Sequence, residues 1–161
     1  MSMTPEPRAT HDRAADDRAT VHWRAVWRGA LVGLSVLLVV SVVQALVDRN
    51  VETFSDSAWV VPLFVAILFG YALGGWQAGR AAPDAGLTNG TLAGVGAFVL
   101  WIPVRIVIWL VRDEDRGLFT GHSPALRPGQ LLGHVVIAAG LGLVGGWLGA
   151  RAATNARRRV S

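Results

Sequence analysis

Residues 30–47 read ALVGLSVLLVVSVVQALV, eighteen consecutive positions without a charged side chain. Crossing about 30 Å of hydrocarbon takes about 20 helical residues, and buried helices of soluble proteins rarely stay apolar for that length. The stretch therefore predicts a transmembrane helix, which we extend to residues 27–47. Its apolar run is continuous, whereas the strands of membrane barrels are short and alternate between apolar and polar side chains.

Three further stretches have the same character, namely residues 58–79, 92–111 and 131–150. Hydrophobic residues make up 52% of the chain and charged residues 16%, whereas soluble proteins carry about 25% charged residues. The charges lie almost entirely between and beyond these stretches. We therefore predict an all-α protein, a four-helix transmembrane bundle over residues 23–153, with a disordered cytoplasmic tail at 1–22 and a basic cytoplasmic tail at 154–161.

The arginines are divided unequally between the two sides of the predicted bundle. All 15 basic residues are arginine; ten flank the termini or the loop between the second and third spans, and four lie in the opposite loops. The positive-inside rule then predicts that both termini are cytoplasmic. An all-arginine basic set is typical of GC-rich bacterial genomes, so we expect a bacterial cytoplasmic (plasma) membrane. The predicted interfacial anchors are Trp27, Trp59, Trp76, Trp109, Trp147, Arg80 and Arg151.

The second and fourth spans end in the same pattern. The sequence GGWxxxRAA occurs at residues 74–82 and again at 145–153, and the first and third spans match more weakly, with Gly29 over Gly90. We interpret this as two tandem helical hairpins related by a pseudo-twofold axis along the membrane normal. Convergence is the alternative, because glycine pairs, an interfacial tryptophan and a closing arginine are common at inner helix ends.

Glycines spaced four residues apart occur in every predicted span. Lipid tails give no hydrophobic drive for helix association, so membrane helices pack where small residues let their backbones approach. The predicted helix-packing residues are Gly29, Gly33, Gly70, Gly74, Gly75, Gly79, Gly90, Gly94, Gly142, Gly145, Gly146 and Gly149. These faces are either all used inside one bundle, or one face per repeat is left for a homo-oligomer or a partner membrane protein.

Three polar side chains, Arg105, Gln44 and His134, fall within the outer third of the predicted spans. Polar groups inside a membrane are candidates for function, and together these three would form a cationic pocket for an anionic or lipid head group. The alternative is that Arg105 extends to the interface as an anchor. The spans contain no Asp or Glu, and the chain has no cysteine and no motif of a hydrolase, metal site or phosphate loop.

With these features, the chain resembles uncharacterised small four-helix, glycine-rich bacterial membrane proteins, over about residues 23–153. The resemblance rests on glycine spacing and hydropathy and implies no activity. We expect no catalytic residue, metal or cofactor, and no nucleic-acid partner despite a pI of 11.2, because the formal net charge is only +4. The expected function is a non-enzymatic structural, assembly or accessory role, packing with itself or a partner among membrane lipids. The alternative is a small transporter or channel for an anionic or lipid-like ligand.

Overall fold

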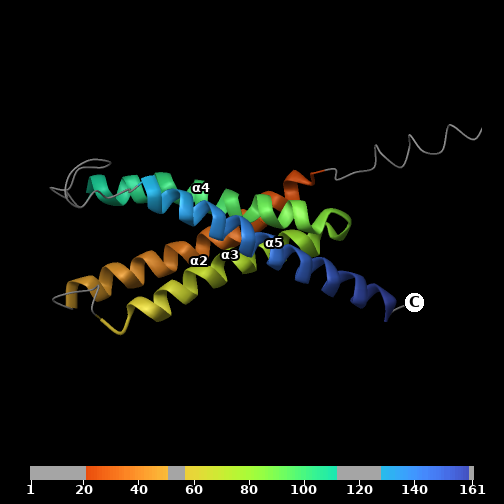
Figure 1. The fold of residues 1–161 in the computed structure, drawn as a ribbon, viewed down its shortest axis with the longest axis horizontal. Coiled ribbons are helices and arrows are strands. Elements are labelled where there is room, and N and C mark those ends of the chain that lie inside the picture. Colours follow the sequence, from red (N-terminus) through yellow and green to blue (C-terminus); the bar gives the residue numbers. More distant parts are fainter. Residues whose placement is uncertain (1–20, 51–56, 112–127, 160–161) are drawn as a thin grey trace, which may run out of the picture.

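The computed structural model describes residues 21–50, 57–111 and 128–159 (Figure 1). These residues form the helices α2 (Trp23–Asn50), α3 (Val60–Ala81), α4 (Gly86–Val111) and α5 (Pro128–Arg158), with a short 3-10 helix, η3 (Pro83–Ala85), between α3 and α4. All four long helices have the length and the apolar composition needed to cross a membrane. The prediction of an all-α, multi-pass membrane protein is confirmed, while the predicted tail at 1–22 lies almost wholly outside the described residues.

A tight connection joins α3 to α4. Ala82, at φ −139° and ψ 78°, leaves the helical conformation, and Pro83 opens η3 directly after it. Gly86 returns to helical angles and begins α4. Because the connection is so short, α3 and α4 are antiparallel neighbours.

The helices extend beyond the predicted spans at the end of the bundle where this connection lies. Helix α4 begins at Gly86 rather than at residue 92, and α5 continues to Arg158, into the segment predicted as a basic tail. Hydropathy marks only the part of a helix that crosses hydrocarbon, whereas its backbone hydrogen bonds continue into the interface. We call this end, which carries Arg24, Arg28 and Arg80, the basic end, and the opposite end the far end.

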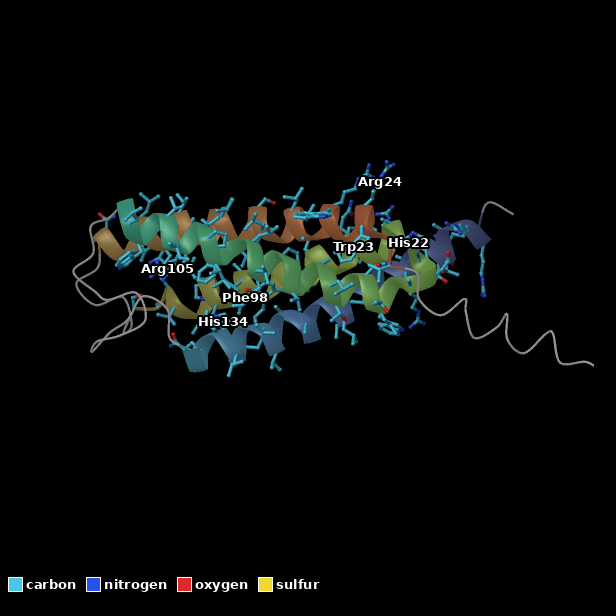
Figure 2. The ribbon with its side chains drawn as sticks, turned by 90° about the horizontal axis from the view of Figure 1, so that it is seen from above. His22, Trp23, Arg24, Phe98, Arg105 and His134 are labelled. Carbon is cyan, nitrogen blue, oxygen red and sulfur yellow. The ribbon has the colours of Figure 1, made fainter. Side chains whose placement is uncertain are left out.

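The four helices are not arranged as a simple ring. Helices α3 and α4 contact each other, and α2 and α5 each pack against both of them but are not close neighbours of one another. Figure 2 shows α3 and α4 lying between α2 and α5. In Figure 1, α2 and α5 cross near the middle of the bundle, and the helices separate toward the far end.

This arrangement does not show the twofold relation between hairpins that the sequence repeat suggests. A twofold axis that exchanged the two hairpins would make the contact between α2 and α5 equivalent to the contact between α4 and α3. In the structure α4 contacts α3 extensively, whereas α2 and α5 have no substantial contact. One expected feature is present, because Gly145 lies against Ala72 and Trp76 and is therefore level with Gly74. The duplication stays a prediction from the sequence.

Small side chains dominate the core. Leu37, Tyr71 and Phe98 form a buried cluster with Ala97 and Ala138 toward the middle of the helices. Large aliphatic side chains face outward instead, for example Leu132 at 71% and Val61 at 68% exposure. An outer surface of this kind is costly in water and is expected where lipid surrounds the helices.

Candidate functional site

Helices α2 and α3 meet through glycines. A Cβ atom added to Gly29 would lie 2.5 Å from the carbonyl oxygen of Gly74, and one added to Gly74 would lie 2.8 Å from the carbonyl oxygen of Gly29. Gly33 and Gly70 continue the contact one turn away. Side chains cannot occupy these positions without moving the backbones apart, so glycine sets the distance between the helices.

The contact between α3 and α5 is closer still. A Cβ atom on Gly79 would lie 2.7 Å from the Cα atom of Gly146, and one on Gly75 equally close to the Cα atom of Gly142. In return, Gly145 of α5 lies against the backbone of α3 at Ala72 and Trp76, and Gly149 lies against Trp76 and Arg80. Helix α3 therefore presents two glycines to α5, and α5 presents four to α3.

Two of these α5 glycines, Gly142 and Gly146, also lie against the backbone of α4. A Cβ atom on Gly142 would lie 2.5 Å from the carbonyl oxygen of Gly90, and a Cβ atom on Gly146 would lie 2.8 Å from the Cα atom of Gly90. Gly86, which lies before the predicted third span, contacts Gly146 and Ala150. All twelve glycines predicted from spacing thus lie against another helix of the same chain.

Spacing alone does not identify such contacts. Gly129 and Gly133 are also four residues apart, yet neither they nor Gly140 would place a Cβ atom within 4 Å of another group. All three lie on the half of α5 nearer the far end, where the helices separate (Figure 1). These open glycines provide an internal control for the packed ones.

The repeated GGWxxxR ends form matching cation–π contacts at the basic end. The guanidinium carbon of Arg80 lies 5.2 Å from the ring centre of Trp76, and that of Arg151 lies 5.4 Å from the ring centre of Trp147. A spacing of four residues places each pair on one helix face. Such a contact contributes about 0.5–1 kcal/mol at an exposed site, and here it holds the charge beside an interfacial ring.

The other predicted anchors lie near the helix ends. Trp27 near the start of α2 is 54% exposed, and Trp59 just before α3 is 51% exposed. Trp109 is half-buried near the end of α4. Tryptophan has an amphipathic ring that is favoured at membrane interfaces.

A cavity of about 40 Å³ lies between the helices in the half of the bundle nearer the far end. All four long helices contribute to its lining, which is Leu37, Ser41, Gln44, Ile67, Tyr71, Trp101 and His134. Of the three residues predicted to form a pocket, the structure brings Gln44 and His134 together here. Arg105 is half-buried but is not part of the lining, and Figure 2 shows it farther toward the far end than Phe98.

Hydrogen bonds fix two walls of this cavity. The indole Nε1 of Trp101 donates to Ser41 Oγ over 3.3 Å, and Ser41 Oγ donates to the carbonyl oxygen of Leu37 over 2.8 Å. His134 Nδ1 lies 2.7 Å from the carbonyl oxygen of Gln130. Because a carbonyl only accepts, Nδ1 must carry a proton, and in the neutral imidazole Nε2 is then an acceptor.

His134 is also held by stacking. Its ring lies 6.1 Å from the ring of Phe98, centre to centre, with 14° between the planes (Figure 2). Sequence reasoning missed Ser41, Tyr71 and Trp101 as cavity residues. One signal was present, because Ser41 precedes Gln44 by three residues and therefore lies on the same helix face.

A second polar feature that the sequence analysis missed lies at the basic end. Asn89 is fully buried, and its Oδ1 accepts a hydrogen bond from the backbone N–H of His22 over 3.1 Å. Its Nδ2 has no partner within the described residues. This hydrogen bond joins the residue before α2 to α4. The sequence did not indicate Asn89 because residue 89 precedes the predicted third span.

The position of Arg105 leads to a first prediction. Because Arg105 does not line the cavity, we expect Arg105→Lys and Arg105→Leu to retain as much anionic phospholipid as the unchanged chain, to within about twofold. Lysine reaches the interface from this depth as arginine does. Phospholipid retained after detergent purification is the measurement. Selective loss in both variants would restore Arg105 to a binding role, since a guanidinium fork recognises phosphate in a way that lysine does not.

The described residues contain no group of three or more His, Cys, Asp or Glu side chains placed to hold a metal ion. These residues form a closely packed bundle with a small cavity that contains polar side chains in its lining. The resemblance seen in the sequence therefore reaches only as far as four apolar helices long enough to cross a membrane. No family model, curated protein or solved structure matches the chain.

Proposed function

We propose that this chain is a non-enzymatic membrane protein with a structural, assembly or accessory role, packing with itself or with a partner protein. The observation that carries the proposal is the backbone contact of α5 with α3 and α4, where glycine leaves no room for a side chain. A solute path needs polar groups and space across the bilayer. In the described residues, the basic half of the bundle is filled by these contacts instead.

The outward surface supports the packing part of the proposal. Helix α5 leaves Gly133 open among exposed aliphatic side chains such as Leu132 and Val136. Small residues let another membrane helix approach closely. In the proposed setting, a bacterial cytoplasmic membrane with both termini inside, this surface is in contact with lipid or with a second protein.

The alternative, a small transporter or channel for an anionic or lipid-like ligand, has one observation in its favour. The cavity that contains Gln44 and His134 lies between all four helices. Its small volume and its lining without Arg105 favour the first proposal for the protein as a whole.

Two measurements on the full-length chain distinguish these functions. Native mass spectrometry of the detergent-purified protein is expected to show particles with more than one copy of the chain. Proteoliposomes are expected to release chloride no faster than vesicles without protein. Particles with a single copy, together with chloride release that Arg105→Leu abolishes, would reject the structural role and support a channel.

A further inference from the structure

The far-end cavity contains two polar groups that helix packing leaves without partners. Tyr71 is 2% exposed and lines the cavity, and within the described residues its hydroxyl makes no hydrogen bond. His134 is half-buried and lines the same cavity, and in the neutral imidazole whose Nδ1 donates to the carbonyl oxygen of Gln130, Nε2 carries a lone pair. Because both residues line the cavity, an occupant there would supply the hydrogen-bond partners that these two groups lack.

The remaining polar groups of the lining are either already paired or lie at the edge. Ser41 and Trp101 are bonded to each other, and Ser41 also donates to a backbone carbonyl. Gln44 is exposed although it lines the cavity, so it lies at the mouth. The occupant must therefore satisfy one donor, the Tyr71 hydroxyl, and one acceptor, His134 Nε2.

Size and charge narrow the chemistry further. The cavity has a volume of about 40 Å³, and one water needs about 10–15 Å³ of such space. About three such groups fit, which is too little for a phosphate head group with its substituents. With Arg105 outside the lining, no permanently charged side chain among the described residues lines the cavity to neutralise an anion.

We propose that this cavity is a binding site for a neutral hydroxyl-bearing group, with Tyr71 donating to the hydroxyl oxygen and His134 Nε2 accepting its proton. A hydroxyl is both donor and acceptor, so a single group satisfies both orphaned side chains. A phosphate or carboxylate oxygen would accept from Tyr71 and leave Nε2 unpaired. The hydroxyl belongs either to water or to an uncharged lipid such as a diacylglycerol.

The test uses the full-length chain with ¹⁵N-labelled histidine, reconstituted in phosphatidylcholine nanodiscs whose lipid carries no hydroxyl. The expected result is magnetisation transfer from a hydroxyl or water proton to His134 Nε2, observed by solid-state NMR, and its loss in Tyr71→Phe. This variant keeps the buried ring and removes only the donor. Ser35→Ala is the matched control, because it also removes one hydroxyl, that of Ser35, which bonds to Val32 and lies outside the cavity lining.

The source of the hydroxyl is settled by adding diolein or triolein, which differ in one free hydroxyl. Transfer without either lipid identifies water. A lipid hydroxyl is identified if transfer occurs only with diolein and diolein also raises the thermal midpoint. Triolein should not raise the midpoint, and Tyr71→Phe should abolish the rise. Absence of transfer under all three conditions, in a chain whose thermal midpoint matches that of Ser35→Ala, would overturn the proposal. Transfer that persists unchanged in Tyr71→Phe would overturn it as well.

Discussion

Replacing Gly79 by alanine is expected to destabilise the chain by about 2–3 kcal/mol, because the added methyl group meets backbone rather than a movable side chain. The nearest atoms would be the carbonyl group and Cα of Gly146, and a real Cβ atom has no place there. At about 2–4 °C per kcal/mol for a chain of this size, the thermal midpoint should fall by roughly 5–10 °C. Thermal unfolding of the detergent-solubilised protein is the measurement.

Gly140→Ala is the matched control for this substitution. Gly140 is also a helical glycine, but a Cβ atom there meets nothing within 4 Å. Alanine is favoured over glycine inside a helix by up to about 1 kcal/mol, so this variant should be neutral or slightly more stable. If Gly79→Ala and Gly140→Ala had the same stability, the close contact between α3 and α5 would be wrong.

A cysteine at position 84 is expected to escape a membrane-impermeant maleimide in intact cells and to react fully once the membrane is opened. Asp84 is exposed in η3, at the basic end. Ten of the arginines lie on that side, so the positive-inside rule predicts that this end is cytoplasmic. We expect labelling to be at least about tenfold higher in permeabilised than in intact cells, because the reagent reaches position 84 only when the membrane is open.

Ser55→Cys provides the opposite case. Residue 55 lies outside the described residues, between α2 and α3, and the same rule predicts that it faces outward. It should be labelled in intact cells. Reaction at position 84 with protection at position 55 would invert the predicted orientation while leaving the helix packing unchanged.

Hydropathy predicted the four helices well but placed their ends poorly. The third span was predicted to begin at residue 92 because residues 86–91 include Thr88, Asn89 and Thr91. In the structure α4 begins at Gly86, where contact with α5 and the bond from His22 to Asn89 stabilise helix that hydropathy does not detect. Tertiary contacts decide such ends, and a single sequence does not display them.

The candidate site was predicted in part, for a related reason. Gln44 and His134 could be selected because polar residues are rare inside membrane spans, and both line the cavity. Arg105 satisfied the same criterion but lies outside the lining. Helical spacing tells which residues share a face of one helix, whereas the cavity depends on how four helices are rotated against each other.

The dual contacts of Gly142 and Gly146 have a consequence for biogenesis. Since these two residues lie against both α3 and α4, α5 needs a groove that exists only after those two helices are side by side. The tight connection through η3 keeps α3 and α4 adjacent, and α2 contacts both of them but not α5 to any large extent. Because the chain is synthesised from the N-terminus, we expect α2, α3 and α4 to associate first and α5 to pack into their groove last.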